Sequence, residues 1–379
     1  MVNDRNAKIR GLLVPVFSVI LGLLIGALIM LVFGYQPMTA YQSMLNASLG
    51  TQRSIGETLR QATPLIFTAL GFSVANSAGF FNIGLSGQAL CGWVASVWFA
   101  LAFPDLPKII LLPLCIIIGA LAGAICAAIP GFLRAYFGTS EVIVTIMMNY
   151  IVLYLSTYIL HEVMPASYRS SLDSSNRITE NASLKIQSLT QFFGGSRING
   201  GLLLALIGLG VVWFVMKKTT LGYEIRAVGL NPFASEYAGM SSKKTIILSM
   251  VLSGTLAGLG GVVEGLGTYQ NFFVQTTSLA IGFDGMAVSL LGNGSSIGIL
   301  LSALLFSVLK IGGLGMQTGA GVPFEIVNVS IALIIFFVAI SFIMHVLLAK
   351  LIPDKKQEDV VQQIQANEDN ADNQKGGDL

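Results

Sequence analysis

The chain contains ten apolar runs that are separated by polar segments. The first run, residues 11–33, carries no charged side chain and is longer than the apolar core of a signal peptide. About 20 apolar residues are enough to cross a bilayer as a helix. Only 11% of the 379 residues are charged, against about a quarter in soluble proteins. The sequence therefore predicts an all-α polytopic membrane protein with about ten transmembrane helices, at residues 11–33, 62–79, 84–103, 108–130, 141–160, 200–216, 245–266, 278–292, 296–312 and 324–348.

The distribution of Lys and Arg predicts how the chain is oriented. With the N-terminus inside, 13 of the 21 basic residues fall on the cytoplasmic side, as the positive-inside rule favours. Both termini are then cytoplasmic. Residues 1–10 form the N-terminal segment, and residues 353–379, polar and almost without apolar side chains, form a disordered tail. The membrane domain covers residues 11–352, with an extracytoplasmic loop at 161–199 and a cytoplasmic loop at 217–244.

The cytoplasmic loop contains the signals of a short helix. Asn231 precedes Pro232, so that an N-cap side chain stands before a residue suited to the first helical position. Gly239 then provides a natural stop. The pattern predicts a helix from Pro232 to Ala238, about 10 Å long. Because this helix lies outside the membrane, between two apolar runs, it is placed to contact a protein partner.

Two pairs of segments indicate an internal repeat. Residues Ile83–Leu90 align with Ile281–Val288, with Ile, Gly, Gly and Ala at the same places, and Gly138–Val144 aligns more weakly with Gly321–Asn328. The members of each pair are five predicted spans apart, so they enter the membrane from opposite sides. This is the pattern of two inverted-topology repeats, a common plan of transporters. The alternative is that glycine-rich apolar segments resemble one another by composition alone.

Several polar side chains lie within or beside the predicted spans, where they are costly unless they have partners. They can line a path for a polar solute, or they can form hydrogen bonds between helices. Glu264 has a further alternative, a solvated place at the outer membrane surface. Glycines spaced four residues apart favour close helix packing. The polar residues are Asn76, Asn82, Gln88, Asn149, Glu264 and Asp284, and the glycine pairs are Gly22/Gly26, Gly119/Gly123, Gly254/Gly258 and Gly261/Gly265.

The sequence lacks the motifs of the common enzyme and nucleotide-binding classes. It contains no P-loop, no Gly-x-Ser-x-Gly, no His-Glu-x-x-His and no dinucleotide fingerprint. Cys91, Cys115 and Cys126 lie in apolar runs without zinc-site spacing. The basic residues are scattered, which argues against nucleic-acid binding. We therefore expect no catalysis, no metal and no cofactor, with energy supplied by a gradient or by another subunit.

Four groups of residues occur together in this chain: Glu57–Pro64, Gly79–Gly84 with Gly87 and Gln88, Arg226–Pro232 with Tyr237–Gly239, and Gly282–Gly285. Together they resemble the branched-chain permease family of ABC importers. Three further features are the sequence Phe81-Asn82-Ile83-Gly84, the extended loop before Gly200 and the chain length. Because of these features, the chain is most similar within this family to the longer permease of bacterial nucleoside importers that depend on a BMP-type lipoprotein.

The resemblance implies a multi-pass protein of a bacterial plasma membrane that works with three partners. These are a cytoplasmic ATP-binding subunit that uses the ATP, a second homologous permease, and an extracytoplasmic lipoprotein that delivers a nucleoside. The short cytoplasmic helix is then the coupling helix that docks into the ATPase. The implied coupling residues are Glu224, Arg226, Asn231, Pro232, Phe233, Glu236 and Gly239, and the candidate substrate path contains Asn76, Phe81, Asn82, Gln88, Asn149 and Asp284.

Other interpretations stay open at the level of the sequence. An importer of the same family for sugars or branched-chain amino acids would share every motif above. A gradient-driven secondary transporter would use Glu264 or Asp284 as a proton site. A membrane enzyme would need a catalytic constellation, which the carboxylates alone do not provide. Arg226 has an alternative place among lipid head groups instead of a docking role.

Overall fold

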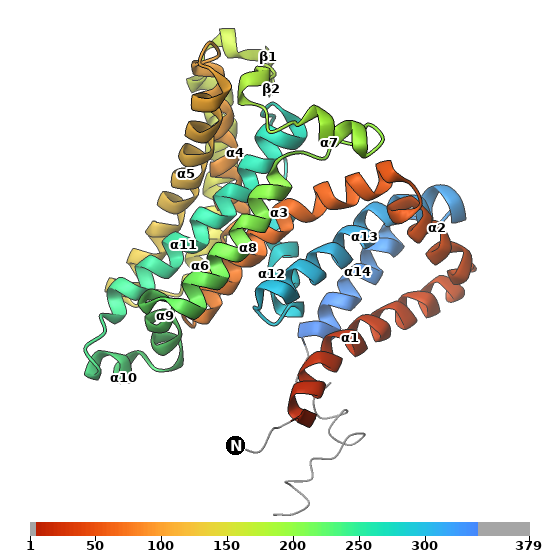
Figure 1. The fold of residues 1–379 in the computed structure, drawn as a ribbon, viewed down its shortest axis with the longest axis horizontal. Helices are drawn as coiled ribbons and strands as arrows, with labels where there is room; N and C mark the ends of the chain where they lie inside the picture. The colour runs from red at the N-terminus through yellow and green to blue at the C-terminus, as the bar shows by residue number, and fades with distance from the viewer. Residues whose placement is uncertain (1–4, 340–379) are drawn as a thin grey trace, which may run out of the picture. The chain divides into compact units, whose positions relative to one another are not determined.

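The computed structural model describes residues 5–339 and divides the chain into two units (Figure 1). One unit comprises residues up to 29 and from 329 onwards, and the other comprises residues 30–328. Helix α1 (Arg5–Val32) and helix α14 (Phe324–Ala339) each begin in one unit and end in the other. In the first unit the Ser18 hydroxyl donates to the Phe337 carbonyl at 3.3 Å. The predicted tail, residues 353–379, lies outside the described residues.

The second unit is built almost wholly of helices. Two π-helical segments extend α6 and α11, and a small hairpin of two antiparallel strands lies between α6 and α8. Between the strands and α8 the chain forms short helical turns. The elements are α2 (Pro37–Leu49), α3 (Gln52–Ser77), α4 (Leu85–Ala102), α5 (Lys108–Phe137), α6 (Glu141–Tyr158), η1 (Ile159–Val163), η2 (Ala166–Tyr168), β1 (Arg169–Ser171), β2 (Ser174–Ser175), η3 (Glu180–Ala182), α7 (Gln187–Phe192), α8 (Gly201–Lys218), α9 (Thr220–Leu230), α10 (Pro232–Tyr237), α11 (Ser242–Val262), η4 (Val263–Tyr269), α12 (Ala280–Leu291) and α13 (Ser296–Ala320).

Helix length and composition support an all-α membrane protein. In the described part of the chain, six helices are long and apolar enough to cross a membrane, and two shorter ones, Val16–Val32 and Ala280–Leu291, are apolar as well. Each of the ten predicted runs contains a helix. The count of ten spans stays a prediction. The six long helices are Leu85–Ala102, Lys108–Phe137, Glu141–Val163, Gly201–Lys218, Ser242–Tyr269 and Ser296–Ala320.

Helices α3 and α13 extend furthest beyond the predicted spans, because charged residues lie within these helices instead of ending them. Helix α3 begins at Gln52, ten residues before the apolar run at 62–79, since Thr58 and Arg60 are buried on it. Helix α13 continues to Ala320 instead of ending at residue 312, which places Lys310 inside the helix and not near its outer end. Glu264 is also buried, in η4, so the interpretation of a solvated surface carboxylate is wrong.

Helices α5 and α11 pack closely through glycines. A Cβ added at Gly258 would lie 2.7 Å from the Gly119 carbonyl oxygen and 3.1 Å from the Gly123 Cα. A Cβ at Gly123 would in turn lie 2.8 Å from the Gly258 Cα. These distances leave no room for a side chain, so the two backbones meet directly. The predicted packing role of the glycine pairs on these two helices is confirmed.

The long segment between α6 and α8 is held against the residues that follow η4. Ser175 N–H donates to the Phe272 carbonyl at 2.7 Å, and Ile178 N–H donates to the Gln270 carbonyl at 2.9 Å. The Trp93 indole donates to the Asn271 carbonyl at 2.9 Å. These bonds satisfy the carbonyl groups of residues 270–272, which are neither helical nor part of a named strand. The segment predicted as an extracytoplasmic loop is therefore folded against the residues that follow η4.

The helices α4 and α12, which begin at the two related motifs, run in opposite directions. Helix α4 runs parallel to α11, and α11 runs antiparallel to α3. Helix α12 runs parallel to α3, so its direction is opposite to that of α4. The contacts that set these directions are Gly92–Gly258 and Val97–Gly265 for α4 and α11, Gly71–Ser253 and Pro64–Gly260 for α3 and α11, and Thr68–Ile281 and Ser73–Gly294 for α3 and α12.

The close contact of α5 with α11 gives a first prediction. Gly258→Leu should lower the free energy of unfolding by about 2 kcal/mol or more, because the new side chain overlaps the α5 backbone. Thermal unfolding of the purified protein in detergent measures the effect. Gly210→Ala on α8 is the matched control, because no atom lies within 4 Å of its added Cβ. Equal thermal midpoints for the two variants would contradict the proposed packing.

Candidate functional site

The short helix predicted in the cytoplasmic loop is present as α10, Pro232–Tyr237. The Asn231 side-chain oxygen accepts a hydrogen bond from the Ala234 N–H at 3.0 Å, as an N-cap does. Pro232 occupies the first turn, and Gly239 follows with φ of +84°, a conformation that favours glycine. The observed helix ends one residue before the predicted end. The prediction of its existence and of its N-cap is confirmed.

Helix α10 presents an aromatic face to its surroundings. Phe233 and Tyr237 are 78% and 96% exposed, one helical turn apart on the same side. Ser235 is buried, and the Ser242 hydroxyl donates to the Pro232 carbonyl at 2.9 Å, which ties α10 to the start of α11. The helix is therefore fixed from behind while its aromatic side chains stay free. The sequence analysis missed Tyr237 as part of this surface, although its spacing from Phe233 is a usable signal.

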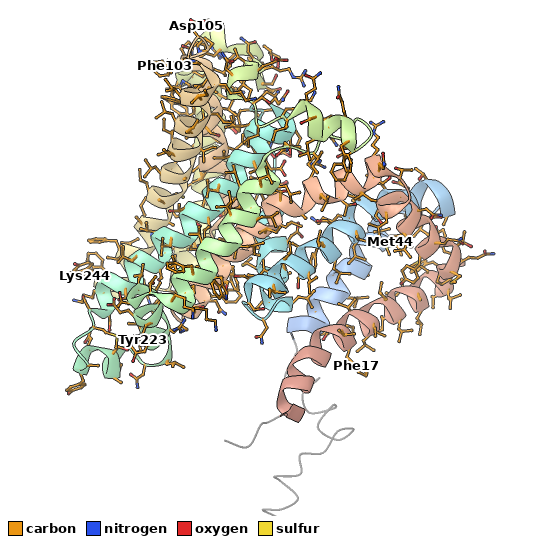
Figure 2. All side chains as sticks on the ribbon, viewed as in Figure 1. Phe17, Met44, Phe103, Asp105, Tyr223 and Lys244 are labelled. Carbon is orange, nitrogen blue, oxygen red and sulfur yellow. The ribbon has the colours of Figure 1, made fainter. Side chains whose placement is uncertain are left out.

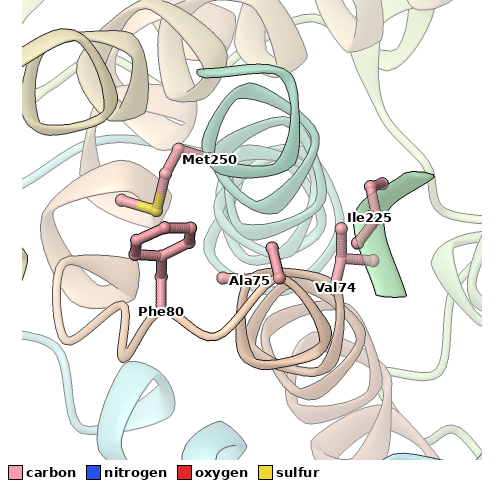
Figure 3. Packing of buried hydrophobic residues seen from close by; sticks show 6 residues of the cluster. Val74, Ala75, Phe80, Ile225 and Met250 are labelled. Carbon is pink, nitrogen blue, oxygen red and sulfur yellow. The ribbon is translucent and has the colours of Figure 1, made fainter. Parts of the chain in front are cut away.

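Helix α9 connects α10 to the membrane helices. Its Ile225 packs in a buried cluster with Val74, Ala75 and Ala78 at the end of α3, Phe80 of the following loop, and Met250 of α11 (Figure 3). A Cβ at Gly79 would lie 3.2 Å from the Gly229 carbonyl oxygen, so the α9 backbone also touches the end of α3. Helix α9 is therefore in direct contact with the end of α3 that leads into the loop before α4.

The two ends of the second unit carry different groups (Figure 2). Tyr223 and Lys244 lie at the end that holds α9 and α10, whereas Phe103 and Asp105 lie at the opposite end. Glu224 lies in α9 and is partly exposed, and Glu236 of α10 is exposed. Arg226 differs from the other predicted coupling residues, because its guanidinium lines a cavity next to α3 and α8.

The break between α3 and α4 is closed by a cluster of buried amides. Asn82 donates to Ser253 Oγ at 2.8 Å and to Gln88 Oε1 at 3.0 Å, and its own oxygen accepts from the Gly84 N–H at 2.9 Å. Asn149 of α6 accepts from the Gly87 N–H at 2.8 Å and donates to the Ile83 carbonyl at 3.0 Å. These bonds satisfy the N–H groups of Gly84 and Gly87 and the carbonyl of Ile83 at the N-terminus of α4. The two amide side chains thus replace the backbone partners that a continuous helix would provide.

The structure brings only some of the predicted path residues together. Asn82, Gln88 and Asn149 share the buried cluster, whereas Asn76 and Phe81 are exposed. Asp284 of α12 forms an ion pair with Lys310 of α13. The sequence analysis missed Lys310, although it and Asp284 are opposite charges in neighbouring apolar runs. Whether these side chains contact substrate stays a prediction.

The two related motifs are direct neighbours. The Ser86 hydroxyl at the start of α4 donates to the Leu279 carbonyl that precedes α12, at 2.8 Å. A Cβ at Gly282 would lie 2.5 Å from the Ser86 N atom. The Thr68 hydroxyl of α3 donates to the Ile281 carbonyl at 2.9 Å. The first turns of α4 and α12 therefore meet beside α3, in the interior of the second unit.

An ion network lies at the start of α3, before the apolar run that begins at Ala62. Arg60 donates to Glu57 Oε2 at 2.8 Å, and the Arg197 N–H donates to Glu57 Oε1 at 2.8 Å. Burial alone would raise the pKa of the Glu57 carboxyl, but the hydrogen bonds from Arg197 and Arg60 hold that pKa below its ordinary value of 4.5. The network thus joins α3 to the segment before α8. Among the described residues, no three His, Cys, Asp or Glu side chains lie close enough together to hold a metal ion.

Comparison with known protein families matches residues 54–344 to the family described as the permease component of branched-chain amino acid transport systems. The match covers most of the chain and includes α3, α4 and the segment from α8 to α13. It also contains α9 and α10, so the capped helix with its aromatic face belongs to the matched region. No solved structure matches the chain.

Three curated relatives cover most of the chain. It is 53% identical over 347 residues to the nucleoside ABC transporter permease protein NupB of Lactococcus lactis subsp. cremoris, covering 91% of this chain and 95% of the relative. It is 46% identical over 344 residues to the guanosine ABC transporter permease protein NupP of Bacillus subtilis, covering 91% and 97%. It is 33% identical over 334 residues to the glucose ABC transporter permease protein TsgB13 of Haloferax volcanii, covering 86% and 87%.

The Glu57 network gives a second prediction. Because its pKa is lowered on folding, Glu57 stabilises the protein fully above pH 4.5 and loses this contribution as the pH falls through its folded-state pKa. Glu57→Gln should therefore lower the thermal midpoint at pH 7, and its difference from the wild type should shrink below pH 4.5. Glu180→Gln is the control, because that carboxyl is exposed. A difference that stays constant with pH would contradict the prediction.

Proposed function

Because the chain belongs to the family of permease components of branched-chain amino acid transport systems, we propose that it is the membrane permease subunit of an ATP-driven importer of nucleosides. The observation that carries the proposal is the capped helix α10 with its exposed Phe233 and Tyr237, found in a chain of this family. A permanently exposed aromatic face on a helix that is anchored from behind is suited to docking into a protein groove. The chain itself is a transport subunit, and the ATP is hydrolysed by a separate subunit.

Nucleosides are the proposed substrate class because the sequence identity to the nucleoside permeases is higher than the identity to the sugar permease. The relatives named for nucleoside and guanosine transport are 53% and 46% identical to this chain, whereas the relative named for glucose is 33% identical. All three comparisons cover most of both chains. The sugar importer is therefore the second candidate. Import of branched-chain amino acids rests on the family description alone.

The proposed docking partner of α10 is a cytoplasmic ATP-binding subunit. Asn231, Pro232 and Gly239 fix the shape of the helix, and Phe233 enters the groove of the partner together with Tyr237. Glu224 and Glu236 are the proposed polar contacts to this subunit, whereas Arg226, which lines a cavity next to α3 and α8, is the proposed member of the coupling set on the membrane side of α9. With α10 on the cytoplasmic side, both termini of this multi-pass protein of a bacterial plasma membrane are cytoplasmic too.

Motion is proposed to pass from α10 to the path through α9. Ile225 packs with Val74 and Ala75 at the end of α3, and that end leads directly into the loop before α4. The hydrogen bonds of Asn82 and Asn149 hold this loop to α11 and α6. A push on α10 would therefore act on α3, α11 and α6 at the non-helical loop between α3 and α4.

The path is proposed to lie between two inverted repeats in a bundle of ten spans. The opposite directions of α4 and α12, and the contact of their first turns, support this arrangement. Gly138 and Gly321 of the second related pair support it as well, because each ends a helix with φ near +64°. Rocking of the two halves would then open the path alternately to each side. The proposed path residues are Asn76, Phe81, Asn82, Gln88, Asn149 and Asp284.

Two further partners complete the proposed importer. A second homologous permease would form the other half of the membrane part. An extracytoplasmic lipoprotein would deliver the nucleoside to the side that carries residues 161–199. This segment is hydrogen-bonded to residues 270–274, and it therefore offers a fixed surface for such a partner. No role in nucleic-acid binding or catalysis is proposed.

The third prediction concerns substrate and energy source. Deletion of the chain should abolish uptake of labelled guanosine and uridine by cells and leave uptake of ribose, glucose and leucine unchanged. Uptake should fall on ATP depletion and resist an ionophore. Loss of uptake of a control solute alone would support the family but overturn the nucleoside substrate. Uptake that collapses with the ionophore and survives ATP depletion would instead indicate a gradient-driven transporter.

The fourth prediction tests the docking surface. Phe233→Ala with Tyr237→Ala should reduce nucleoside uptake by about tenfold or more, because interface aromatic residues often contribute about 2 kcal/mol or more each. The amount of protein in the membrane should not change, since both side chains are exposed. Co-purification of the ATP-binding subunit provides a second measurement. Phe192→Ala, an aromatic that is 69% exposed on the other side, is the control. Normal uptake by the double variant would remove the coupling assignment.

A further inference from the structure

A cavity lined by both polar and apolar side chains lies where the ends of α3, α8 and α12 meet α9 and the start of α13. Its volume is about 460 Å³. Two basic side chains, Lys217 and Arg226, line it, and none of its lining residues is acidic. The Nη1 atom of Arg226 is buried and has no hydrogen-bond partner among the described residues. That atom has no exposed surface, so a ligand in the cavity would not touch it; the two basic side chains, with no acidic residue in the lining, are what favour an anion.

The backbone at the cavity adds to its positive character. The turn at Asn293 and Gly294 has positive φ angles, and Ser295 caps the 25-residue helix α13. The N–H groups of Ser296 and Ile297, at the first two positions of α13, have no acceptor within their own helix. The N-terminus of this long helix thus faces the cavity that Arg226 lines. Both features favour the oxygens of a phosphate group.

The surroundings of the cavity indicate where that phosphate comes from. Trp213 on its wall is 50% exposed, and Ile297 is 75% exposed, as expected at the boundary of a membrane. A second pocket of about 310 Å³ follows α8 from Leu204 to Met216, and every side chain that lines it is apolar except Thr255. Val212 and Met216 line both pockets. The apolar pocket is roughly 18 Å long at 1.5 Å per residue, which suits an acyl chain.

We propose that this cavity binds the phosphate of an anionic phospholipid, with one acyl chain of the same lipid in the adjoining apolar pocket along α8. Arg226 and Lys217 bind the phosphate oxygens, and the first turn of α13 donates N–H groups. Lys217 lies at the end of α8 that also carries the cytoplasmic loop, so the lipid belongs to the leaflet on that side. Anionic lipids are enriched in the cytoplasmic leaflet. Asn76, which is also a proposed path residue, lines the same cavity, so a bound lipid would lie beside the proposed path.

The test measures lipid binding to the full-length protein in detergent by native mass spectrometry. Dipalmitoyl phosphatidylglycerol and dipalmitoyl phosphatidylcholine are compared at equal concentration, with phosphatidylglycerol expected to bind at least tenfold more tightly. Arg226→Gln with Lys217→Gln should weaken binding of phosphatidylglycerol about thirtyfold, because each of the two basic residues near the surface adds about one kcal/mol. Lys218→Gln is the matched control, since Lys218 is the next residue on α8, is exposed and does not line the cavity. Equal binding of the two lipids, or unchanged binding by the double variant, overturns the proposal.

A second variant keeps the test valid if the double variant does not fold. Asn293→Asp changes no side-chain shape and adds a negative charge at the cavity. It should weaken phosphatidylglycerol binding and leave phosphatidylcholine binding unchanged. Unchanged phosphatidylglycerol binding by this variant would contradict the proposal.

Soluble probes distinguish a lipid from free phosphate. Glycerol 3-phosphate and inorganic phosphate should raise the thermal midpoint less than phosphatidylglycerol does, because they cannot fill the apolar pocket. Dioctanoyl phosphatidylglycerol should bind more weakly than the dipalmitoyl form for the same reason. A soluble phosphate that protects as well as the lipid would overturn the lipid assignment. Because these measurements do not involve transport, failure of the lipid proposal is distinct from failure of nucleoside uptake.

Discussion

The structure depends on the satisfaction of backbone hydrogen bonds where helices break inside an apolar bundle. A membrane supplies no water to free N–H and C=O groups, so each break needs protein partners. Asn82 and Asn149 supply them at the start of α4, and Ser86 and Thr68 supply them at the start of α12. Both helices can therefore begin within the bundle, and their first turns can meet next to a possible path.

The same requirement explains why polar residues near the path are not automatically substrate ligands. Asn82 uses both atoms of its amide in hydrogen bonds within the protein, and Asn149 does the same. Phe81 is exposed directly beside this cluster. The amides therefore keep the break in shape, and Phe81 is the proposed path residue that stays exposed here.

Local patterns were predictable from the sequence, whereas pairings between distant residues were not. The helix α10 follows from Asn231, Pro232 and Gly239, which act within one or two turns. The ion pair of Asp284 with Lys310, the burial of Glu264 and the early start of α3 depend on residues far apart in the chain. A hydropathy profile ends a predicted span at a charged residue, because it contains no information on the partners of that charge. For this reason the boundaries near Arg60 and Lys310 were wrong.

Two neighbouring residues of α9 face different surroundings. Helix α9 therefore links the proposed coupling surface to the proposed lipid cavity. Ile225 faces the apolar cluster at the end of α3, whereas Arg226 faces the cavity. A phosphate on Arg226 would hold α9 to α8 and to the start of α13 through shared contacts. A ligand shifts a conformational equilibrium only if its contacts differ between the states. Since α9 is the proposed route from α10 to the path, a lipid bound at Arg226 would favour whichever state keeps α9 beside Lys217.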